Sequence, residues 1–229
     1  MRPALVAACG VIGVLSIDFV KEAAAAGGPY VVDDFEVTPR EAKVETWTSF
    51  GDNADSLYVV NPSYTLDVWH GIEFGAQLTR SHEEDDWGTA VAPKIKATIL
   101  PLDTYGIGVG FIVTGGYNLR TDRTETYSAI VPLTVEPIED VRINVNLGWE
   151  HDQEAEKDLM FWGVGSDWQI NENLALIGEV FGRNEGRPGF QVGLRPTLLD
   201  GKMDLHLVAG RNITDVEANW ITVGLTLRF

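Results

Sequence analysis

Apolar and polar residues alternate along most of this chain with the period of a β-strand, in which successive side chains point to opposite faces. The clearest segment places these apolar residues on one face: Tyr105, Ile107, Val109, Phe111 and Val113. Glycines and Thr114 fall on its other face. Segments of this type predict twelve strands, at 42–50, 56–66, 72–81, 89–100, 105–118, 126–136, 141–150, 159–169, 174–182, 189–198, 203–211 and 220–229.

The connections between the predicted strands alternate in length. Short ones contain turn residues, as at Asn171–Asn173 and Asp200–Gly201. The others, including 81–88 and 151–158, are mostly longer and more highly charged. Antiparallel strands turn at alternate ends of a sheet, so the pattern predicts short periplasmic turns at one end and longer acidic outer loops at the other. That asymmetry is typical of bacterial outer-membrane barrels.

The face opposite the apolar one carries charged and amide side chains, which is the reverse of a soluble barrel with an apolar interior. An even number of antiparallel strands closes without leaving a strand edge unpaired in lipid. The predicted fold class is therefore all-β, a closed antiparallel transmembrane β-barrel of about 12 strands (roughly 10–14) over residues 42–229. Such a barrel lies between the filled eight-stranded barrels and the open porins, so we expect a narrow, partly blocked lumen.

The first 26 residues have the pattern of a secretory signal peptide. Arg2 supplies the positive start, the apolar stretch runs from Ala4 to Ile17, and Ala23–Ala26 supply the small residues before cleavage. We predict a signal peptide at 1–26 and a periplasmic N-terminal segment at 27–41, and we place the barrel in the outer membrane of a Gram-negative bacterium. The N-terminal segment is a candidate to fold into the lumen.

The amino-acid composition limits the kinds of partner and cofactor that we expect the protein to bind. The formal net charge of -17 argues against a nucleic-acid partner, whose phosphates would be repelled. The single cysteine, Cys9, lies in the predicted signal peptide, and the four histidines lack the spacing of a zinc site. We therefore predict neither a metal nor a cofactor.

The chain ends in a segment whose apolar face includes the terminal Phe229. This ending looks like the signal that the barrel-assembly machinery reads, and Phe229 is the residue we assign to it. The expected partners are that machinery, outer-membrane lipids and lipopolysaccharide, and a small-molecule solute.

The predicted mature chain begins with Pro29-Tyr30-Val31-Val32-Asp33-Asp34 and enters its first strand near Val44-Glu45. This start resembles the family of outer-membrane transporters named for the meta-pathway of phenol degradation. The sequence departs from the family pattern at Val32, where threonine is usual, at Phe35, where proline often follows, and at Val44, where tryptophan is usual. The resemblance implies a barrel for the uptake of small molecules, hydrophobic or aromatic ones among them.

The inward faces carry the residues that we expect to line a pore: Glu73, Lys94, Lys96, Arg142, Asn144, Asn146, Glu179, Arg195, Asp204 and His206. In one arrangement they form a selectivity lining, with a cationic strip (Lys94, Lys96, Arg142 and Arg195) opposite acidic counterparts (Glu73, Glu179 and Asp204). In the other, the charges pair and neutralise one another in a salt-bridged interior.

These features predict a porin-like channel or transporter for passive passage of small molecules, and not an enzyme. One alternative is an outer-membrane hydrolase acting on lipids, in which Asp204 would orient His206 from the same strand face. No nucleophile motif surrounds the serines that face inward. The other alternative is a structural or adhesive barrel that transports nothing.

Overall fold

The structure is a computed structural model that describes residues 30–51, 56–69, 71–83, 86–186, 188–213 and 219–229. The predicted signal peptide lies outside these residues. Within the described ranges, no helix is long and apolar enough to cross a membrane.

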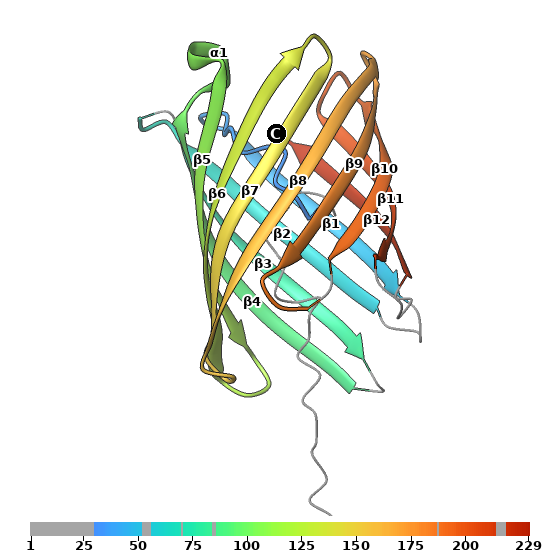
Figure 1. The fold of residues 1–229 in the computed structure, drawn as a ribbon. Helices are drawn as coiled ribbons and strands as arrows, with labels where there is room; N and C mark the ends of the chain where they lie inside the picture. Colours follow the sequence, from blue (N-terminus) through green and yellow to red (C-terminus); the bar gives the residue numbers. More distant parts are fainter. Residues whose placement is uncertain (1–29, 52–55, 70, 84–85, 187, 214–218) are drawn as a thin grey trace, which may run out of the picture.

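Twelve antiparallel strands form one closed barrel (Figure 1). They are β1 (Ala42–Gly51), β2 (Ser56–Leu66), β3 (Ile72–Glu83), β4 (Asp86–Leu100), β5 (Ile107–Asn118), β6 (Arg123–Ile138), β7 (Val141–Asp152), β8 (Lys157–Asn171), β9 (Leu174–Arg183), β10 (Gly189–Leu198), β11 (Met203–Asn212) and β12 (Asn219–Arg228). A four-residue helix, α1 (Leu102–Tyr105), precedes β5. Every strand pairs with its sequence neighbour, which confirms the predicted fold class.

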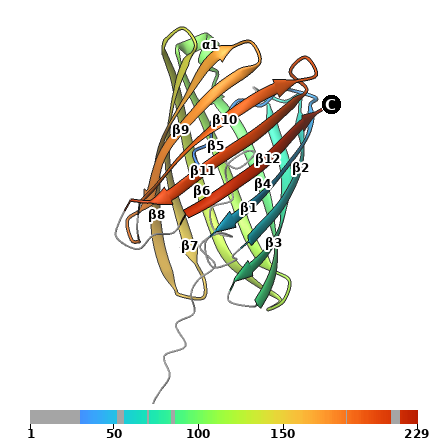
Figure 2. The same ribbon diagram turned by 90° about the vertical axis from the view of Figure 1, so that its right-hand side faces the viewer.

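The barrel closes where β1 pairs with β12, and the two strands lie side by side in Figure 2. Their register places Trp47 opposite Gly224. The backbone of Phe229 extends this seam, because its N–H donates to the carbonyl of Ala42 at 2.9 Å and its carbonyl accepts from the Ala42 N–H at 3.3 Å. No strand edge is left open between β1 and β12, as a barrel in lipid requires.

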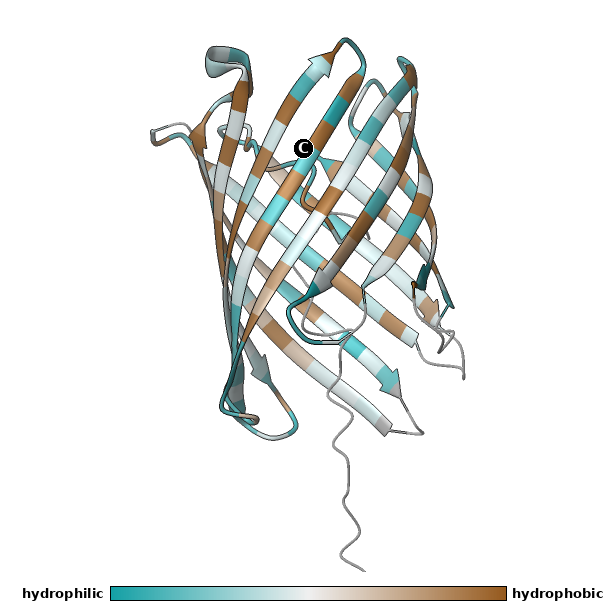
Figure 3. Ribbon diagram, viewed as in Figure 1, coloured by the Kyte–Doolittle hydropathy of each residue, from teal (hydrophilic) through white to brown (hydrophobic). Residues whose placement is uncertain are grey.

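The exterior of the barrel is apolar, and the interior combines polar and charged side chains with three apolar clusters. In β2, Tyr58, Val60 and Tyr64 are exposed, whereas Asn61 and Thr65 are buried. The same alternation recurs along the other strands, and Figure 3 shows it as alternating apolar and polar bands. A barrel of this kind presents to its surroundings the side chains that favour hydrocarbon.

The structure differs from the predicted strand limits at both ends of the barrel. Tyr105 belongs to α1 and not to a strand, because the chain turns there through Gly106, whose φ of 72° suits glycine. At the opposite end, β3 and β4 reach Glu83 and Asp86, and β7 and β8 reach Asp152 and Lys157. The strands thus extend into segments predicted as long loops, because the backbone ladder continues through charged residues.

The connections between strands distinguish the two ends of the barrel, which we call the turn end and the loop end. The turn end carries 67–71, 101–106, 139–140, 172–173 and 199–202, together with Ala42 and Phe229. The loop end carries the connections between β1 and β2, β3 and β4, β5 and β6, β7 and β8, β9 and β10, and β11 and β12. Residues 30–37 lie inside the barrel between these ends, and residues 38–41 lead from there into β1 at the turn end (Figure 1).

Candidate functional site

Residues 30–37, which we call the lumen segment, occupy the interior of the barrel. Tyr30 packs against Phe181 and Trp220 near the loop end, with ring centroids 4.0 and 5.9 Å away. At the other end of the segment, the Val37 N–H donates to the hydroxyl of Thr98 at 3.2 Å. The segment therefore crosses the lumen from the wall formed by β8 and β9 to the wall formed by β4 and β5, and it ends close to the turn end.

Side chains of the wall hold the backbone of the lumen segment. Asn146 binds Val32 twice, since its Oδ1 accepts from the Val32 N–H at 2.9 Å and its Nδ2 donates to the Val32 carbonyl at 3.2 Å. Glu179 accepts from the Tyr30 N–H at 2.9 Å. None of residues 30–37 is part of a β-strand. The segment is thus held as a bound peptide would be, and not as a thirteenth strand.

Glycines in the wall make room for the apolar side chains of the lumen segment. A β-carbon at Gly108 would overlap the ring of Phe35, and one at Gly110 would lie 3.0 Å from the Phe35 Cβ. Across the lumen, a β-carbon at Gly163 would lie 2.8 Å from Val31 Cγ2. Any larger residue at these inward positions would displace the segment.

The paired aspartates of the lumen segment face different parts of the wall. Asp34 accepts from Lys43 Nζ on β1 at 2.6 Å and lies 3.4 Å from Lys96 Nζ on β4. Asp33 pairs with Arg195 on β10. The two carboxylates therefore tie the segment to strands that lie far apart in the sequence.

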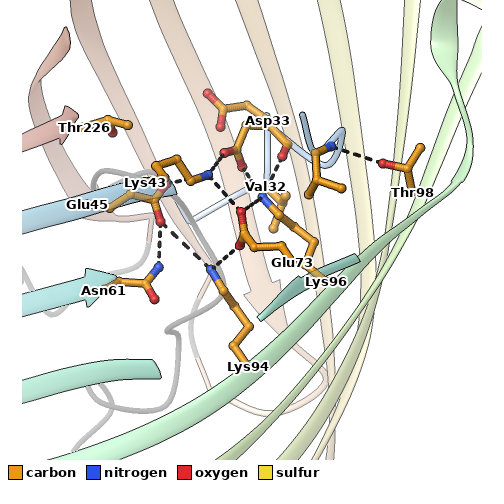
Figure 4. A network of polar contacts seen from close by, with 12 residues as sticks. Val32, Asp33, Lys43, Glu45, Asn61, Glu73, Lys94, Lys96, Thr98 and Thr226 are labelled. Carbon is orange, nitrogen blue, oxygen red and sulfur yellow. Dashed lines mark hydrogen bonds and ion pairs between the residues drawn. The ribbon is translucent and has the colours of Figure 1, made fainter. Parts of the chain in front are cut away.

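Asp34 joins a network of buried charges on β1, β3 and β4. Lys43 Nζ lies 3.1 Å from Glu45 and 3.5 Å from Glu73. Lys94 and Lys96 lie 3.4 and 3.7 Å from carboxylate oxygens of Glu73. Figure 4 shows these lysines pointing at the shared carboxylates, with Asn61 donating to Glu45 at 2.6 Å. With Asp34, three cations meet three carboxylates, so the buried network is balanced.

A second polar cluster surrounds Arg195. Its guanidinium lies 2.9 Å from Asp167 on β8, and Asp167 also accepts from Asn144 at 2.7 Å. Asp204 pairs with Arg228 at 2.7 Å. These contacts satisfy charges that would otherwise be costly to bury.

The predicted pore-lining residues fall inside the barrel, with one exception in position. Glu73, Lys94 and Lys96 come together as described, and Asn144, Asn146, Glu179, Arg195, Asp204 and His206 are buried in the lumen or face it. Arg142 is on the inward face of β7, as expected, but it lies at the turn end. There its half-exposed side chain pairs with Glu136 at 2.6 Å.

The predicted cationic strip is therefore wrong as a single array. Lys94 and Lys96 lie on β4, Arg195 lies on β10, and Arg142 lies at the rim, because the position of a residue along its strand sets its height in the lumen. The charges pair locally, as the salt-bridged arrangement predicted.

Two residues that shape the site were not predicted to line the lumen, and the contacts of two others were not predicted. Lys43 and Glu45 were predicted within a strand but not as lining, although they share the inward face of β1 with buried Trp47. Asp33 and Asp34 belong to the segment that was expected to fold into the lumen, but their pairing with Lys43, Lys96 and Arg195 was not predicted. The signal for the two aspartates was the uncommon pair of acidic residues directly beside apolar Val31, Val32 and Phe35.

Fold and site together define a barrel of the outer-membrane type, with an apolar exterior, a charged lumen and an internal segment. The chain belongs to the family described as uncharacterised conserved protein UCP029691, which matches residues 14–229. No curated protein sequence matches the chain. The family does not carry the phenol meta-pathway name, so that finer resemblance stays a prediction.

Solved structures share the fold. The COG4313 outer membrane channel from Pseudomonas putida F1 is similar with a TM-score of 0.63 and 9% identity, over 86% of this chain and 98% of that chain. The KdgM porin is similar with a TM-score of 0.61 and 10% identity, over 82% and 99% of the two chains. Outer membrane phospholipase A from Escherichia coli is similar with a TM-score of 0.52 and 11% identity, over 85% and 93%. At these identities the similarity concerns the fold alone.

Proposed function

We propose that this protein is an outer-membrane channel for passive passage of small molecules, and that residues 30–37 close its lumen. The observation that carries the proposal is the way the lumen is filled. Side chains of the strands suffice to fill an eight-stranded barrel. Here the wall instead has glycines at 108, 110 and 163, and the lumen segment occupies the space that larger side chains would fill.

The lumen segment can leave the lumen without disrupting the barrel. Its backbone is held by side chains such as Asn146 and Thr98, and no strand pairing would have to break for it to leave. A passage left by an extended chain measures about 5 by 10 Å, the spacing of neighbouring strands by the spacing of stacked sheets. Such a passage suits small molecules and excludes folded proteins.

The location of the barrel, its assembly and its class of solute are further parts of the proposal. The apolar exterior suits an outer membrane, where the chain would meet lipids and lipopolysaccharide after export through a cleaved signal peptide. Phe229 is exposed on the outside at the closing seam, which suits recognition by the barrel-assembly machinery. We retain the aromatic solutes of the phenol meta-pathway resemblance as one candidate class of solute.

Single-channel recording in a planar bilayer tests the proposal. We expect the refolded full chain to insert and to show rare, brief openings, because the lumen segment is held by the wall. Steady closure of the wild type would still be compatible with a channel if variants with a loosened segment conduct. A folded, inserted protein whose loosened variants never conduct would contradict the proposal and favour a structural barrel.

The lipid-hydrolase alternative depends on His206. That side chain is buried in the lumen, and its Nε2 lies 3.5 Å from the hydroxyl of Thr226, so it faces away from the bilayer. We therefore propose that the protein has no lipase activity at this residue. His206→Ala should leave the rate of phospholipid hydrolysis by purified protein at the level of the wild-type sample. A loss of hydrolysis in His206→Ala would instead favour the enzyme.

A further inference from the structure

We infer that the cations holding Asp33 and Asp34 form a binding site for a solute that carries two or more carboxylates, and that the two aspartates occupy this site in the closed channel. The inference rests on the proposed channel function and names its solute class. The site consists of Lys43, Lys96 and Arg195, which we call the cation site.

The aspartates bind cations of the wall through contacts that the carboxylates of a solute could also make. Asp34 meets the buried cations Lys43 and Lys96. Asp33 meets Arg195, which is partly exposed and also pairs with Asp167. Arginine presents a planar fork of donors that matches a carboxylate. The cations come from β1, β4 and β10, so the fold assembles a receptor for two carboxylates held on one chain.

Movement of the lumen segment would leave a net positive charge in the lysine network of the wall. Lys43, Lys94 and Lys96 would then face only Glu45 and Glu73, which leaves one positive charge in excess. A buried excess charge attracts counter-ions strongly, because the surroundings screen it poorly. An anion entering the opened lumen would restore the balance that Asp34 provides in the closed state.

Neutral groups that form hydrogen bonds accompany the cation site. Asn146 offers both a donor and an acceptor, and it uses both on the backbone of Val32. Thr98 accepts from the Val37 N–H through its hydroxyl. These groups would remain for the hydroxyl or carboxyl oxygens of a solute, so the site combines charge with orienting hydrogen bonds.

The tethered aspartates compete with any solute. A tethered group acts at an effective concentration of about millimolar for a short linker. A solute with carboxylates must therefore outcompete the lumen segment, and its binding would favour the open channel.

The test removes the competing charges without changing side-chain size. In the full chain, Asp33→Asn/Asp34→Asn is compared with the wild type, using adipate as the probe. Adipate is a linear dicarboxylate, and 1,6-hexanediol is its neutral counterpart of equal length. We expect the double variant to conduct, to prefer anions in a salt gradient, and to bind adipate about tenfold more tightly than the wild type in equilibrium dialysis. Hexanediol should bind neither protein.

Glu36→Gln is the matched control. Glu36 belongs to the same segment, but its carboxylate accepts from the Leu102 N–H at 2.7 Å and does not meet the cation site. This variant should bind adipate as weakly as the wild type does. Adding Lys96→Met to the double variant should return adipate binding to the wild-type level.

The outcomes separate the inference from the proposed function. If the double variant conducts without anion preference and binds adipate no better than the wild type, the inference is overturned and the channel stands. If it binds adipate but no variant conducts, the site exists and the channel function fails. Dialysis alone decides the inference when the double variant remains closed, since equal binding by both proteins overturns it.

Discussion

A disulfide between residues 31 and 165 is expected to hold the channel closed. We propose Val31→Cys/Gly165→Cys in the Asp33→Asn/Asp34→Asn background, whose lumen segment has lost its ion pairs. A β-carbon at residue 165 would lie 3.3 Å from the Val31 Cβ, close to the separation of about 3.5–4.5 Å found in disulfides. Oxidation should lower the mean current by about tenfold or more, and a reducing agent should restore it.

Each single cysteine variant in the same background serves as the control. With Cys9→Ser in all of these proteins, it carries one thiol and forms no bond within the lumen. Cys9 is the only native cysteine, and it lies in the predicted signal peptide. Formation of the disulfide is checked by the mass of the peptide that joins the two sites. Persistent current through fully cross-linked protein would show that solutes pass elsewhere than along the space of the lumen segment.

Removing the charge of Lys43 is expected to cause the largest loss of stability. Lys43 Nζ contacts Asp34, Glu45 and Glu73 within 3.5 Å, and its side chain is almost completely buried. Lys43→Met would leave these carboxylates short of one cation. Loss of one partner from a buried ion pair costs about 3–5 kcal/mol, and we expect a decrease of about 3 kcal/mol in the free energy of unfolding. Urea titration of detergent-refolded protein, followed by tryptophan fluorescence, measures it.

Two further variants identify the cause of that loss. Lys43→Met/Glu45→Gln restores the charge balance and should recover about 1 kcal/mol or more. Arg142→Gln removes a charge whose pair with Glu136 is half-exposed, and it should cost at most about 1 kcal/mol. Equal losses in Lys43→Met and Arg142→Gln would contradict a special role for the buried network.

Many residues of the lumen could be predicted from the sequence, because the alternation of apolar and polar residues along a strand shows which side chains face inward. Glu73, Lys94, Lys96 and Asn146 were correctly predicted to face inward from their strand parity alone. Alternation does not show how far along the barrel axis a residue lies. For this reason Arg142, which lies at the rim, was predicted together with residues that lie deeper in the lumen. The paired aspartates were visible as a motif, but the sequence contains no sign of which cations they meet.

By itself, the sequence determined the number and order of strands, the polar lumen and the apolar exterior, because these follow from a period of two repeated in every strand. Only the tertiary structure decided what fills the lumen. Asp33 and Arg195 are 162 residues apart, and they meet only after β1 pairs with β12 and closes the barrel. The role of the inward glycines Gly108 and Gly163 was likewise visible only in the tertiary structure. They make room for a segment that no local sequence pattern places beside them.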